Sequence, residues 1–201
     1  MPSSTDANWP ESILKLFESV RILPPYRRYP APFNRLLHHV VADDSYSLFV
    51  SMHNTPYDTA PLDPTDFFVF YLVTTQQQEP VLIVGIKDDR SDGLITRLKA
   101  DAQIRQWYEE LLCHCPIPRL YGLSLLGTSL RIYCGHKDTG DITPCIVDRP
   151  SADCVLPLDF LEGEWDLDLM SPAGFNRMQE IAAYVKAEVA NIENEVEACQ
   201  L

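Results

Sequence analysis

Apolar residues recur with helical spacing in several parts of the chain. Residues 11–20 and 33–41 each carry an apolar stripe with members three and four positions apart. Residues 94–113 form the clearest amphipathic segment, with one charged line made of Arg97, Asp101 and Arg105. The opposite line of this segment is apolar and consists of Ile104, Trp107, Tyr108 and Leu111. These patterns predict three helices.

A fourth helical pattern lies near the end of the sequence. Ser171 is placed to cap a helix whose first residue is Pro172. The apolar positions that follow alternate at intervals of three and four residues, which is the spacing of a coiled-coil heptad. They are Phe175, Met178, Ala182, Val185, Val189, Ile192 and Val196.

This heptad pattern allows two arrangements. The helix can pack on its own sheet, or it can present an exposed seam to a partner. Acidic residues such as Glu188, Glu193 and Glu195 flank the seam and would repel a parallel copy of the helix. For an exposed seam we therefore expect an antiparallel homodimer or a basic protein partner.

Alternating or continuous apolar runs predict strands at residues 45–52, 66–75, 81–87, 120–126, 129–134 and 142–147. A short polar turn at 76–80 joins the second and third of these runs into an antiparallel hairpin. Strands and helices together predict an α/β fold, with a mixed central β-sheet of four to six strands flanked by helices. Four prolines within residues 24–32 predict an extended connector.

The organisation along the chain predicts one domain. Residues 1–32 form an N-terminal helix and a Pro-rich strap, residues 33–150 form the core, and residues 151–201 form an acidic loop and the C-terminal helix. A length of 201 residues with 46% hydrophobic residues fits such a domain.

Composition narrows the function classes. A formal net charge of −13 disfavours broad binding to phosphate backbones. Neither an apolar run long enough to cross a membrane nor a secretory signal is evident. Six cysteines without framework spacing are typical of reduced thiols, so we expect an intracellular protein, cytoplasmic or nuclear, without a membrane segment.

Candidate chemistry lies in the central hairpin and the helix that follows it. An acidic segment at 63–66 precedes the hairpin, and the second hairpin strand ends in Gly85, Ile86 and Lys87. The next helix carries Gln103, with Trp107 four residues later. This order resembles the PD-(D/E)XK, or restriction-endonuclease-like, nuclease superfamily, and it also resembles uncharacterised fungal proteins of that fold.

The resemblance implies a restriction-endonuclease-like core and a metal-dependent site. Asp66 would hold Mg²⁺ or Mn²⁺, Lys87 would orient the attacking water, and Gln103 would support the substrate. The metal-binding carboxylate expected two residues before the lysine is replaced by Gly85. Asp89 keeps the face of Lys87 and could supply a relocated metal ligand, whereas Asp88 would need a bulge. Pairing of Thr74 with Val81 would place Asp66 opposite Asp89.

Three functions follow from these residues. The first is a non-catalytic nuclease-like domain that serves in binding or assembly and needs no cofactor. The second is an active nuclease that uses Mg²⁺ or Mn²⁺ with a relocated carboxylate. The third is a small-molecule enzyme or binder with an aromatic pocket made of Phe68, Phe70, Trp107 and Tyr108.

Other metal or nucleophile patterns are weaker. Cys113, Cys115, Cys134 and His136 could bind zinc, although their spacing fits no recurring zinc motif. The acidic residues at 159–168 are more typical of a solvated surface than of a calcium loop. His53 has no evident serine or cysteine partner in the sequence.

Overall fold

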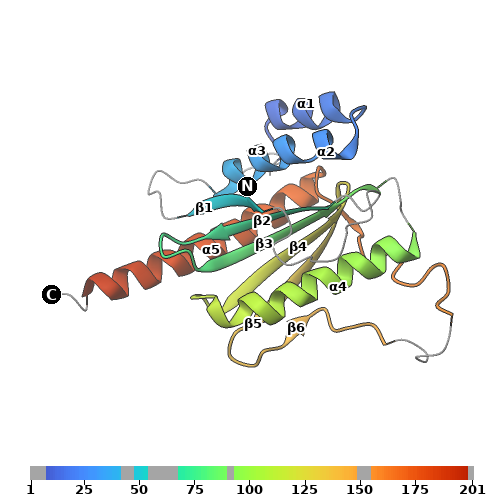
Figure 1. Cartoon of the computed structure of the whole chain (residues 1–201). Helices are drawn as coiled ribbons and strands as arrows, with labels where there is room; N and C mark the ends of the chain where they lie inside the picture. The colour runs from blue at the N-terminus through green and yellow to red at the C-terminus, as the bar shows by residue number, and fades with distance from the viewer. Residues whose placement is uncertain (1–7, 42–47, 54–67, 90–92, 149–154, 199–201) are drawn as a thin grey trace, which may run out of the picture.

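The structure is a computed structural model that describes residues 8–41, 48–53, 68–89, 93–148 and 155–198. A mixed seven-stranded sheet forms its centre, with helices on both faces (Figure 1). The strand order is β1-β2-β3-β4-β5-β6, and β7 also pairs with β5. Only β3 and β4 run parallel among these pairs. The predicted mixed α/β class is confirmed. The strands are β1 (Phe49–His53), β2 (Phe68–Thr74), β3 (Pro80–Lys87), β4 (Arg119–Leu126), β5 (Ser129–His136), β6 (Ile142–Thr143) and β7 (Leu167–Asp168).

The predicted hairpin forms between β2 and β3. Its register pairs Phe68 with Lys87 and Val73 with Leu82, which is the register that the sequence predicted for most of the hairpin. An irregularity after Val73 places Thr74 opposite Pro80 instead of Val81. Asp66 lies outside the described residues, so its predicted position opposite Asp89 stays a prediction.

One helix, α4 (Leu94–Leu111), connects β3 to β4 and continues into the short helix η2 (Leu112–His114). Tyr108 of α4 lies tightly over the sheet, because a Cβ added to Gly122 or to Gly135 would lie 2.7 Å or less from its side chain. Two glycines that face this ring on neighbouring strands therefore allow α4 to approach closely. A parallel pair joined by such a crossover helix is buried on both faces, and all eight residues of β3 are buried.

The opposite face of the sheet is covered by α3 (Pro30–Val41) and α5 (Pro172–Ala198). The helices α1 (Glu11–Val20) and α2 (Pro25–Arg28) pack on α3 (Figure 1). Tyr184 of α5 packs edge-on against Tyr121 of β4, with ring centroids 5.5 Å apart. Trp9, just before α1, donates its indole N–H to the carbonyl of Leu169, 2.7 Å away. This hydrogen bond ties the N-terminal helices to the start of α5.

The prediction of an extended connector at residues 24–32 is wrong. Pro25 is the first residue of α2 and Pro30 is the first residue of α3. Proline is tolerated there because the first N–H groups of a helix have no intrahelical partner, and its fixed φ suits the helix. The prolines therefore mark two helix starts instead of a polyproline segment.

The heptad residues of α5 pack into the protein's own core. Met178, Val185 and Val189 are each no more than 2% exposed, and Phe175 and Ile192 pack against the same core. This is the first of the two predicted arrangements, since these side chains face the sheet and α3. The side chain of Val196 lies outside the described residues, and the end of α5 extends past the sheet (Figure 1).

Candidate functional site

The predicted site residues Gly85 and Lys87 lie at the end of β3, in the middle of the sheet. Gly85 pairs with Phe70 of β2 on one side and with Ser124 of β4 on the other. Because Ile83 pairs with Gly122, which lies under α4, Gly85 and Lys87 also point toward α4. Lys87 is only 2% exposed, so its amine is enclosed between the sheet and this helix. The predicted sharing of one face by Gly85 and Lys87 is confirmed by the register.

An aromatic pair lies beside Gly85 on this face. Phe70, the direct neighbour of Gly85 across the hairpin, packs on Trp107 of α4 with ring centroids 3.8 Å apart. Both rings are buried. Gly85 has no side chain that would compete with these rings for the space between strand and helix.

Gln103 lies on α4, one turn before Trp107. Its side-chain oxygen is buried and accepts no hydrogen bond from any residue that the structure describes. A buried amide oxygen without a donor is costly, so this position favours an additional donor. In the sequence, only the resemblance singled out Gln103.

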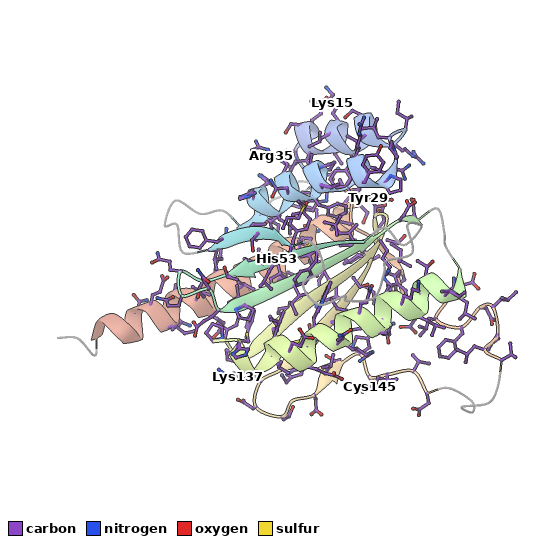
Figure 2. All side chains as sticks on the ribbon, in the orientation of Figure 1. Lys15, Tyr29, Arg35, His53, Lys137 and Cys145 are labelled. Atoms are coloured by element: carbon purple, nitrogen blue, oxygen red, sulfur yellow. The ribbon has the colours of Figure 1, made fainter. Side chains whose placement is uncertain are left out.

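Asp89 has a different setting from the one that the sequence predicted. Its carboxylate accepts hydrogen bonds from the Tyr29 hydroxyl at 3.1 Å and from Arg28 Nη1 at 3.3 Å. The neighbouring Asp88 is buried and accepts a second bond from Tyr29 at 3.0 Å. Figure 2 shows Tyr29 between the N-terminal helices and the end of the sheet. We call Arg28, Tyr29, Asp88 and Asp89 the strand-end cluster.

The strand-end cluster is well paired and carries one net negative charge. Burial raises the pKa of the Tyr29 phenol above its ordinary value, and the carboxylates of Asp89 and Asp88 add to this rise, although the hydrogen bond from Arg28 opposes it. Tyr29 therefore stays a neutral donor. Arg28 and Tyr29 contact the same carboxylate oxygen of Asp89, Oδ1, and the side chain remains half-exposed.

The sequence does not reveal the two partners of Asp89 that α2 and the residue after it contribute. Arg28 and Tyr29 are about sixty positions away from the carboxylates, and they lie in the segment that was predicted to be an extended connector. In the sequence these two residues stand out only by lying among prolines, and that position does not indicate a contact with distant carboxylates.

A second charged cluster lies under α4, where the predicted charge line is buried. Asp101 accepts bonds from Arg105 Nε at 2.9 Å, Arg131 Nη1 at 3.1 Å and the Tyr133 hydroxyl at 2.7 Å. Arg131 also lies 2.9 Å from Glu164 and stacks against the ring of Trp165. Each charged side chain has a partner of opposite charge, although Arg131 Nε has no hydrogen-bond acceptor among the described residues. We therefore interpret the cluster as a structural link between α4, β5 and the acidic loop.

The structure also brings together a serine and a histidine that the sequence did not connect. Ser51 Oγ lies 2.9 Å from His53 Nε2, since residues two apart share a face of β1. Ser51 Oγ also donates to the carbonyl of Leu72 at 3.3 Å. Within the described residues no carboxylate orients His53, so the pair lacks the third group of an activated nucleophile.

The structure does not group the candidate zinc ligands, and it places three of the four residues of the predicted aromatic pocket in the core. Cys113 is exposed, whereas Cys115 is buried and its thiol donates to the carbonyl of Ile117. Burial raises the pKa of the Cys115 thiol to about 11. Among the described residues no three His, Cys, Asp or Glu side chains, the acidic loop included, are grouped as metal ligands. Phe70, Trp107 and Tyr108 belong to the core, and the side chain of Phe68 lies outside the described residues.

Two pockets adjoin Asp89. The larger, of about 320 Å³, lies between α1, the strand-end cluster and the β4–β5 turn, and we call it the strand-end pocket. The smaller, of about 120 Å³, lies beside Arg97 and Trp165. Neither is lined by Gly85, Lys87 or Gln103.

In the described residues no helix is long and apolar enough to cross a membrane. Comparison with protein-family models, with curated proteins and with solved structures gave no match to this chain.

Proposed function

We propose that this chain is a non-catalytic, nuclease-like domain that serves in binding or assembly. One observation carries the proposal: the position two residues before buried Lys87 is a glycine, and the rings of Phe70 and Trp107 are packed beside it. A hydrolytic metal site needs carboxylate ligands and room for water and substrate. This face lacks that carboxylate and is filled by closely packed rings. It therefore fits a nuclease-like fold without catalytic activity better than an active metal site.

The order of elements supports the nuclease-like frame. An antiparallel hairpin ends in Lys87, α4 carries Gln103 over the same sheet face, and β4 follows parallel to β3. These features agree with the resemblance stated for the sequence. Fold alone does not imply activity, so the frame is compatible with a binding role.

A metal-dependent nuclease is the second candidate, and half-exposed Asp89 favours it. In that case Asp66 and Asp89 would hold Mg²⁺ or Mn²⁺, Lys87 would orient water and Gln103 would support the substrate. The ion pair between Asp89 and Arg28, with 3.3 Å between the nearest atoms, argues against it. A divalent ion needs several converging ligands, and among the described residues Asp89 belongs to no group of three His, Cys, Asp or Glu side chains.

The binding or assembly role includes a protein partner inside the cell. Because Met178, Val185 and Val189 are buried and Ile192 packs against the same core, a partner or a second copy would use the end of α5 after Ile192. This part of the helix extends past the sheet (Figure 1). The net charge of −13 favours a basic partner over nucleic acid.

The experiment is a cleavage assay with single- and double-stranded DNA and RNA in Mn²⁺. The native chain is compared with Gly85→Glu, which restores a carboxylate, and with Lys87→Ala. We expect no cleavage by the native chain. Cleavage by Gly85→Glu alone would show that the fold supports nuclease activity and that the glycine at position 85 abolishes it. Cleavage by the native chain that is lost in Lys87→Ala would overturn the proposal in favour of the nuclease.

A further inference from the structure

The strand-end pocket has the size and the mixed lining of a small-ligand site. Its volume of about 320 Å³ is at the lower end of the range for such sites. Phe17 and Val20 of α1 and Met170 before α5 supply an apolar wall. Separate parts of the chain therefore build one concave surface beside the strand-end cluster.

Carboxylates outnumber guanidinium groups in this lining by three to two. Glu18, Asp89 and Asp168 line the pocket together with the guanidinium groups of Arg21 and Arg28. Arg28 is already committed, because its Nη1 lies 3.3 Å from Asp89 and 3.7 Å from Asp88. Once Asp88 is counted, four carboxylates lie in or beside the pocket for two guanidinium groups.

Asp168 and Asp89 keep free hydrogen-bonding capacity. One oxygen of Asp168 accepts the Met170 N–H at 3.0 Å, and its side chain makes no other hydrogen bond with the described residues. The Asp89 side chain remains 54% exposed despite its bonds to Arg28 and Tyr29. An anionic ligand would be repelled both by this lining and by the net charge of −13.

We propose that the strand-end pocket binds an extended organic cation, an ammonium or guanidinium group on an aliphatic stem. The charged head pairs with Asp89 and Asp168, and the stem lies against Phe17, Val20 and Met170. The cation is either a free amine or the basic side chain of a peptide, since both present the same chemistry. This proposal goes beyond the proposed function and does not depend on whether the Gly85 face is catalytic.

The test is a titration followed by ¹H–¹⁵N NMR and by calorimetry. Agmatine and cadaverine represent the free amines, and the peptides acetyl-Gly-Arg-Gly-amide and acetyl-Gly-Lys-Gly-amide represent the side chains. The neutral 1,5-pentanediol and the anionic glutarate are the matched controls. We expect saturable binding of at least one cation, with shifts around Asp89 and Met170, and stronger binding in the arm that matches the natural source. Binding should weaken as salt is added.

Variants locate the binding. Asp168→Asn should weaken the affinity for the cation about two- to fivefold, the range for one exposed ion pair. Asp138→Asn is the control, because it is exposed on the turn after β5, at the opposite end of the β4–β5 hairpin from Gly127. It removes the same charge and should leave the affinity unchanged.

Three results would overturn the proposal. They are tighter binding of glutarate than of the cations, equal loss of affinity in Asp168→Asn and Asp138→Asn, and no saturable shift with any of the four cations. A failure of the cleavage prediction changes none of these readouts, so the two proposals can fail separately. Asp168 is exposed, so its variant should fold even where a change at Asp89 disturbs the strand-end cluster.

Discussion

Gly127 shows how one residue supports the strand-end cluster. It lies in the two-residue turn between β4 and β5 with φ of +62°, a conformation that costs other residues about 1–2 kcal/mol. A Cβ at this position would lie 2.8 Å from both Cβ and Oδ2 of Asp89. Since Asp89 Cβ is fixed to the backbone, the contact cannot be relieved by rotating the carboxylate alone.

We predict that Gly127→Ala lowers the free energy of unfolding by about 2–3 kcal/mol, from the left-handed conformation and the displacement of Asp89 together. Gly140→Ala is a matched control, because Gly140 also has a positive φ, +75°, but a Cβ there would meet nothing within 4 Å. It should cost about 1 kcal/mol. Urea denaturation measures both, and equal losses would contradict the role given to Gly127.

At the scale of elements, the sequence predicted most helices and strands but not every boundary. The hairpin register, α1, α4 and α5 follow from periodicity, because one buried face imposes a strict spacing of apolar residues. The predicted strand at 142–147 shortens to Ile142–Thr143, since Pro144 has no N–H for a ladder. Pro25 and Pro30 misled the prediction because proline is compatible both with an extended chain and with a helix start.

For α5, we predict that Val185→Asp lowers the free energy of unfolding by about 4 kcal/mol or more, because it buries a charge in the core. Ala187→Asp, on the exposed side of the same helix, should change it by no more than about 0.5 kcal/mol. The measurement is urea denaturation at two protein concentrations.

The concentration dependence separates the two arrangements of the heptad residues. A core position gives the same loss at both concentrations, because folding involves one chain. If Val185 instead stabilised an assembly of chains, stability would rise with concentration in the native chain and not in the variant. That result would show that the heptad residues of α5 form an interface between chains.

At the scale of the whole molecule, the candidate site was predictable only in part. Strand alternation in the sequence is enough to place Gly85 and Lys87 on one face, and the resemblance drew attention to Gln103. The partners of Asp89 were not predictable, because Arg28 and Tyr29 approach it only through the packing of α2 on the end of the sheet. Local sequence patterns give the spacing of residues within one helix or strand, whereas the strand-end cluster forms only when distant segments pack together.

The proposed function requires that the nuclease-like domain holds no catalytic metal. Calorimetric titration of the native chain with Mn²⁺ tests this directly. The comparison is Asp89→Asn, because Asp89 is the predicted metal ligand that the structure describes and the substitution removes its charge. We predict no saturable binding to either protein, because Gly85 supplies no carboxylate and no three potential metal ligands are grouped among the described residues. Stoichiometric Mn²⁺ binding to the native chain that is lost in Asp89→Asn would contradict the claim and establish a relocated metal site.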